Sequence, residues 1–103
     1  MVGTWTGTIA GYEGVDAVYV DKPFKIVVQE ANGQAFVGSM EWTEPDGTIA
    51  DDAVRGGVTA MGQVTILDAD GLFTLSVSDS KLFGTYVEQG EDAGVLAVEL
   101  TRE

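Results

Sequence analysis

Apolar side chains recur at every second position along most of this chain, between short stretches rich in glycine and acidic residues. A two-residue period of this kind is typical of β-strands that bury one face. No window of helical length repeats apolar residues at a 3.6-residue period without an interrupting glycine or turn dipeptide. The pattern therefore predicts an all-β protein in which any helix is a single turn.

Eight segments carry the alternation and are rich in Val, Ile, Thr, Phe, Tyr and Trp. The predicted strands are residues 2–10, 24–29, 35–42, 53–59, 63–67, 72–78, 82–89 and 95–102. Residues 11–21 are expected to form a longer acidic connection in which Val18-Tyr19-Val20 is already extended. Pro23 marks a bulge, an edge or a strand start, because it lacks a backbone donor. Asn32-Gly33 predicts a two-residue type I′ hairpin, since both residues tolerate positive φ.

The connections determine the expected fold. All except residues 11–21 are hairpin-short, so strands that are consecutive in sequence are expected to lie side by side. An open sheet of this size would expose two edges, whereas a closed barrel removes both and has an interior that side chains fill or that holds one small ligand. The sequence predicts one domain, residues 1–103, folded as an eight-stranded antiparallel up-and-down β-barrel whose wall bends at Gly38. A two-sheet β-sandwich is the alternative.

Charge and composition exclude several classes of function. Five basic residues against 17 acidic ones give a net charge of −12, which repels nucleic acids and anionic membrane surfaces. The absence of cysteine and histidine removes disulfides, thiol nucleophiles, the usual metal ligands and the usual general base. No apolar run approaches the roughly 18 residues of a membrane span, and the N-terminus lacks the features of a signal peptide. We expect a cytoplasmic protein without cofactor, metal, nucleic-acid partner or membrane partner.

Large apolar side chains dominate the predicted inward faces, and they have two interpretations. The simpler one is that they fill the core. The functional one is that some of them line a pocket at the barrel mouth, because ligand pockets are mostly apolar with a few placed polar groups. We expect a barrel that binds a small hydrophobic molecule under partial cover from residues 11–21. The candidate ligand-binding residues are Trp5, Phe24, Phe36, Met40, Trp42, Phe73 and Tyr86.

The strand at residues 82–89 offers candidate chemistry. Leu82, Gly84, Tyr86 and Glu88 share one of its faces, and either face is compatible with the pattern. If this face points inward, burial raises the pKa of the Glu88 carboxyl toward values useful for proton transfer. Glu88 and Tyr86 are then the weak catalytic candidates for a cofactor-free cyclase or isomerase. A solvated Glu88 at a strand end is the alternative.

Two further features of the sequence bear on function. Asp68-Ala69-Asp70-Gly71 is similar to a calcium loop, but the register would place Ile66 and Val77 at ligand positions, so we expect an ordinary turn. A third class of function, self-assembly as a homodimer, follows from the outward positions of Val27, Val37 and Val87 in the predicted register.

The start of the first strand, Gly3-Thr4-Trp5, followed by a meander of hairpins, resembles the calycin group of barrels, the lipocalins and avidins. The resemblance implies a calycin-like barrel over the whole chain. It also implies that Trp5 lies across the barrel floor. It implies no particular ligand.

Overall fold

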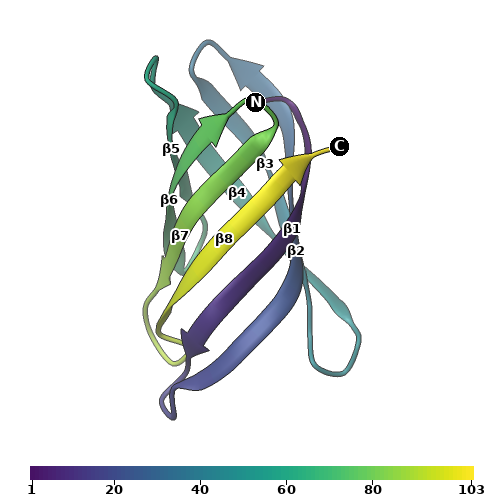
Figure 1. The fold of residues 1–103 in the computed structure, drawn as a ribbon, viewed down its shortest axis with the longest axis vertical. Coiled ribbons are helices and arrows are strands. Elements are labelled where there is room, and N and C mark those ends of the chain that lie inside the picture. The colour runs from purple at the N-terminus through teal and green to yellow at the C-terminus, as the bar shows by residue number, and fades with distance from the viewer.

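The chain folds as a closed β-barrel of eight antiparallel strands and has no helix, hence none long and apolar enough to cross a bilayer (Figure 1). A computed structural model describes every residue from 1 to 103. Each strand pairs with its neighbour in sequence, and β8 pairs with β1 to close the wall. The predicted up-and-down barrel is confirmed, and the β-sandwich alternative is wrong. The strands are β1 (Gly3–Glu13), β2 (Val18–Asn32), β3 (Ala35–Thr43), β4 (Ile49–Val58), β5 (Gln63–Leu67), β6 (Gly71–Ser78), β7 (Lys81–Glu88) and β8 (Gly94–Arg102).

The first hairpin is longer than the alternation predicts. Residues 11–13 continue β1 and pair with residues 18–20 of β2, so that only residues 14–17 form a turn. The predicted connection over residues 11–21 is therefore wrong, although Val18-Tyr19-Val20 is extended as expected. The apolar alternation lapses because the hairpin runs past the core, where backbone hydrogen bonds rather than burial hold the two strands together.

The pairing of β2 accounts for Pro23 and shifts the predicted turn at Asn32-Gly33 by one residue. Pro23 pairs with Thr8 of β1 and lies one residue before the pairing with β3 begins, so it sits at a local edge where no donor is needed. The hairpin to β3 is present, but its central residues are Gly33 and Gln34 instead of Asn32-Gly33. Only Gly33 has a positive φ, of 61°, which is typical of a type II′ turn with glycine first.

The inward faces of all eight strands meet in one core of 17 buried apolar side chains. Trp5 and Phe36 both belong to it, as the barrel register requires, and Trp42 packs against it half-buried. The face of β7 that carries Tyr86 points inward. At Gly38 a Cβ atom would collide with the backbone carbonyl of Val27, so this glycine permits the close approach of β2 and β3 where the wall was expected to bend.

The two ends of the barrel differ. Both termini lie at one end (Figure 1), where Trp5 is buried and its indole Nε1 donates to the carbonyl of Met1 at 3.0 Å. The Arg102 guanidinium lies 5.6 Å from the centre of the Trp5 ring, and it donates to the carbonyl of Val2 at 2.6 Å. These contacts seal this end, which we call the sealed end. The turns β1–β2, β3–β4, β5–β6 and β7–β8 surround the opposite end, which we call the open end.

Candidate functional site

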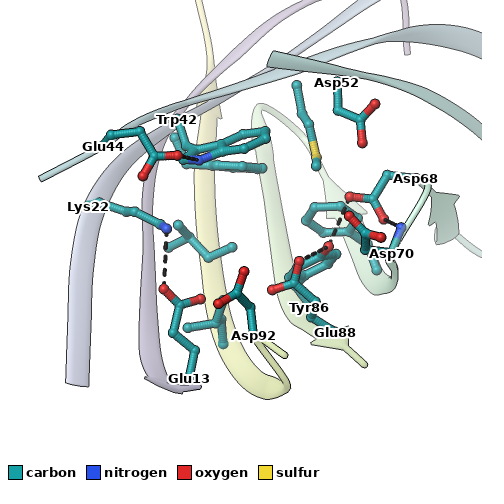
Figure 2. A pocket seen from close by; sticks show the side chains of 15 residues that line it. Glu13, Lys22, Trp42, Glu44, Asp52, Asp68, Asp70, Tyr86, Glu88 and Asp92 are labelled. Carbon is teal, nitrogen blue, oxygen red and sulfur yellow. Dashed lines mark hydrogen bonds and ion pairs between the residues drawn. The ribbon is translucent and has the colours of Figure 1, made fainter. Parts of the chain in front are cut away.

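A cavity of about 250 Å³ lies inside the open end of the barrel (Figure 2). Its inner part, which we call the floor, is apolar and is supplied by six of the eight strands. The ring of Phe73 lies 4.3 Å from that of Tyr86 and 5.8 Å from that of Phe24, measured between centroids. These separations are typical of packed aromatic pairs. The floor residues are Ile9, Phe24, Met40, Trp42, Phe73, Tyr86 and Leu96.

The mouth of the cavity is strongly acidic. Seven carboxyl side chains line it together with one ammonium group, that of Lys22. The Lys22 ammonium lies 3.6 Å from a Glu13 carboxylate oxygen, and no other ion pair involves these residues. No three acidic side chains converge closely enough to hold a metal ion. The mouth carboxylates, as we call them, are Glu13, Glu44, Asp52, Asp68, Asp70, Glu88 and Asp92.

Tyr86 connects the floor to the mouth. Its hydroxyl donates to Asp68 Oδ2 at 2.9 Å, and Glu88 Oε1 lies 3.5 Å from the same hydroxyl oxygen (Figure 2). The other oxygen of Asp68 accepts hydrogen bonds from the backbone amides of Asp70 and Gly71, at 3.1 and 2.5 Å. Asp68 therefore holds the β5–β6 turn and the tyrosine at once, and this segment is a turn, as the sequence predicts.

Two groups of the site have shifted pKa values. Burial raises the pKa of the Glu88 carboxyl to about 7, and the nearby charges of Asp92, Glu13 and Asp68 raise it further in that order of importance. Burial also raises the pKa of the Tyr86 phenol, with the hydrogen bond to Asp68 adding to the effect. Near neutral pH, Glu88 therefore exchanges a proton readily, whereas Tyr86 remains a donor.

Trp42 forms one side of the cavity. Its indole Nε1 donates to Glu44 Oε1 at 2.7 Å, so the ring is held in place and the carboxylate is held at the mouth (Figure 2). A hydrogen bond to a charged acceptor is stronger than one between neutral groups. This side of the cavity is thus held in place by a hydrogen bond.

The structure separates the predicted binding residues into two groups. Phe24, Met40, Trp42, Phe73 and Tyr86 line the cavity, and Glu88 lies at its mouth. Trp5 and Phe36 do not line the cavity. Trp5 is packed at the sealed end, and the Phe36 ring fills the space beside Gly56, where a Cβ atom would lie 2.5 Å from it.

The sequence analysis missed most of the mouth carboxylates and Lys22, although their positions carry a signal. Glu13 lies on the same strand face as Ile9, and Lys22 lies on the same face as Phe24. Most of the mouth carboxylates likewise continue the inward-facing alternation of their strand beyond its last apolar residue. The alternation therefore already placed these charges inside the barrel.

Fold and site together define an eight-stranded antiparallel β-barrel that is sealed at one end and has an acidic cavity at the other. No protein-family model matches the sequence, and no curated protein is significantly similar to it.

Proposed function

We propose that this protein binds a small molecule, with its apolar part on the floor of the cavity. The observation that supports this proposal is the cavity itself, about 250 Å³ with aromatic side chains on its floor, in a barrel sealed at the other end. Ligand sites are concave and mostly apolar, and barrel mouths are a frequent location for them. At the packing density of protein interiors this volume suits about a dozen non-hydrogen atoms.

The sequence resemblance to lipocalins and avidins supports the same proposal. Those barrels place a tryptophan across their closed end, and the position of Trp5 at the sealed end is compatible with that arrangement. The calycin relationship remains part of the proposal, since it depends on Gly3-Thr4-Trp5 and on the meander.

The direct test is a screen of small hydrophobic molecules by thermal shift and native mass spectrometry, followed by titration of tryptophan fluorescence. We expect saturable binding that changes the emission of Trp42, which lines the cavity, and that disappears in Met40→Trp, which fills the cavity. Met61→Trp is the matched control, because Met61 is 90% exposed on a turn. A screen in which no compound stabilises the barrel would count against the proposal.

A second candidate function is cofactor-free catalysis by proton transfer. Its specific support is Glu88, whose pKa lies at about 7 above the apolar floor of the cavity, with the Tyr86 hydroxyl 3.5 Å away. A general base is most effective when its pKa lies near the working pH. In this role Glu88 would remove a proton from carbon, and the Tyr86 hydroxyl would redirect its hydrogen bond from Asp68 to the developing anion.

The catalytic candidate can be tested with 5-nitrobenzisoxazole, which opens to a coloured cyanophenolate when a base removes its ring proton and the N–O bond breaks. We expect turnover that increases with pH around 7 and that is lost in Glu88→Gln but kept in Glu30→Gln, at an exposed site outside the cavity. Equal rates in the two variants would eliminate Glu88 as the base.

A third candidate is self-assembly, supported by a row of exposed apolar side chains across the outer wall. Each member of the row is the cross-strand partner of the next, and their exposed fractions lie between 41% and 62%. The row consists of Leu67, Leu72, Val87, Val95, Tyr12 and Tyr19. Of the other two valines predicted to face outward, Val37 is exposed and Val27 is half-buried. The continuous apolar row favours contact with a second copy, whose identical row packs against it, and this contact has to offset the repulsion between two chains of net charge −12.

Light scattering over a range of protein concentrations tests the assembly candidate. We expect a dimer in the wild type and a monomer in Val95→Glu, which places a charge within the row. Val37→Glu is the control, because Val37 is similarly exposed but lies outside the row. A wild-type protein that stays monomeric at every concentration rules out this candidate.

A further inference from the structure

We propose that the ligand of the cavity is an organic cation, an amine with an apolar body of aromatic or aliphatic character. This inference rests on the proposed binding function and specifies the chemistry of its ligand. In the bound state the apolar body would lie on the floor residues and the ammonium group among the mouth carboxylates.

The charge around the cavity selects a cation. Seven carboxyl groups and one ammonium group line the cavity, and the ammonium of Lys22 already faces Glu13 at 3.6 Å. Electrostatic interactions are stronger in a partly enclosed site than in bulk water, because less solvent screens them. An anionic ligand would be repelled, and a neutral one would gain nothing from this charge. A positive charge that enters the cavity reduces the cost of crowding these carboxylates together, as protonation of Glu88 does.

The aromatic side chains of the floor also favour a cation. The faces of aromatic rings carry partial negative charge and attract cations within about 6 Å. Trp42, Phe73 and Tyr86 line the cavity, and Trp42, the most exposed of the three, extends from the floor toward Glu44 at the mouth. An amine can therefore interact favourably with the rings and with the carboxylates at the same time.

The arrangement of the carboxylates favours an organic cation over a metal ion. Metal ions in oxygen sites need several ligands around one point, whereas no three acidic side chains of this protein converge in that way. Asp68 is moreover engaged by two backbone amides and by the Tyr86 hydroxyl. The charges surround the entrance, which suits an ammonium group that interacts with several carboxylates at longer range.

A series of probes that differ only in the head group tests the inference. We would measure the binding of 4-phenylbutylamine, 4-phenylbutanol and 4-phenylbutyrate by calorimetry at pH 8 and low salt, with n-butylamine as the probe without a ring. We expect 4-phenylbutylamine to bind about tenfold more tightly than the alcohol, with 4-phenylbutyrate weakest. The advantage of the amine should shrink as salt is added, because salt screens the mouth carboxylates.

Variants locate the effect. Glu88→Gln combined with Asp92→Asn should weaken binding of the amine about five- to tenfold and leave binding of the alcohol unchanged. The matched control is Glu30→Gln combined with Asp79→Asn, which removes the same charge from exposed sites near the sealed end. Asparagine suits residue 79, whose φ is +55°. If the control pair weakens the amine equally, the effect is one of net charge and the inference is wrong.

The outcomes separate the two proposals. Binding of the alcohol or the carboxylate as tight as that of the amine overturns the cation inference and leaves the binding function standing. Binding of n-butylamine as tight as that of 4-phenylbutylamine also overturns it, because the floor would then contribute nothing. If none of the three phenyl compounds binds and the emission of Trp42 does not change, the binding function itself fails.

Discussion

At the scale of single residues, Glu88 combines the functional interest of the site with a cost in stability. Its folded pKa of about 7 lies above the ordinary value of 4.5, so the folded state binds this proton more tightly than the unfolded state does. The contribution to stability is therefore fully present below about pH 4.5 and is lost as the pH rises through about 7. The charged form of Glu88, placed among other carboxylates, therefore lowers the free energy of unfolding.

We therefore predict that Glu88→Gln is more stable than the wild type at pH 8 and that most of this difference is gone at pH 5, where the folded carboxyl is protonated. The amide is neutral at both pH values, whereas the wild-type carboxylate is charged only at the higher one. Urea unfolding at the two pH values measures the difference, and Glu30→Gln controls for the change in net charge. A stability difference that is the same at both pH values would contradict the assigned pKa.

Gly71 is the second residue on which the site depends. A Cβ atom there would lie 2.5 to 2.6 Å from the hydroxyl and ring of Tyr86. We predict that Gly71→Ala destabilises the protein by about 1 to 3 kcal/mol and displaces the tyrosine. In the background of Tyr86→Leu, whose shorter side chain leaves room, the same change should cost much less. A double-mutant cycle of unfolding free energies measures this coupling, and simple additivity would show that the contact is unimportant.

At the scale of elements, the alternation predicted β3 and the four strands from β5 to β8 to within one residue at each end. These strands are bounded by short turns and lie mostly within the core, so the apolar pattern runs their whole length. The alternation failed where strands extend beyond the core, at the end of β1, at both ends of β2 and at the start of β4. None of the residues there is buried, and apolar ones such as Tyr12, Val18 and Ile49 are exposed, so only the cross-strand hydrogen bonds show that a strand continues.

The candidate site was predictable in part for the same reason. Phe24, Met40, Trp42, Phe73 and Tyr86 follow from the inward alternation. Most mouth carboxylates follow from it too, once the antiparallel order is used to see which strand ends meet. Asp70 could not be found in this way, because it lies in a turn out of phase with its strand. The cavity itself depends on how completely the side chains fill the interior, which no pattern of residue types determines.

The turn between β2 and β3 makes a contribution to stability that can be measured at Gly33. Gly33 has a φ of +61°, a value that costs an alanine about 1 kcal/mol. We predict that Gly33→Ala lowers the free energy of unfolding by about this amount and that Gly33→Asn lowers it less. Gly57→Ala is the control on the neighbouring strand, because a Cβ there meets only one atom, at 3.6 Å. Chemical unfolding of the three variants provides the measurement, and equal losses in all of them would refute the assigned turn.

At the scale of the whole molecule, the two ends of the barrel differ in packing and in charge. The sealed end holds both termini, and Arg102 links them by covering the Trp5 ring and by binding the carbonyl of Val2. The open end concentrates like charges around a cavity, which disfavours stability and, under the proposed function, favours the binding of a cation. The contacts at the sealed end therefore add stability at a distance from the charges of the open end.

This division leads to a prediction about Arg102, which lies far from the cavity. Arg102→Gln removes the cation over the Trp5 ring and the hydrogen bond to Val2, so we expect the free energy of unfolding to fall by about 1 to 3 kcal/mol. Ligand affinity at the open end should stay within about twofold of the wild type, because no atom of the site is touched. Arg55→Gln is the matched control, since Arg55 is exposed on the outer face of β4 and should contribute little. Urea unfolding and calorimetry on the same samples separate the two effects, and a loss of affinity as large as the loss of stability would show that the two ends are coupled.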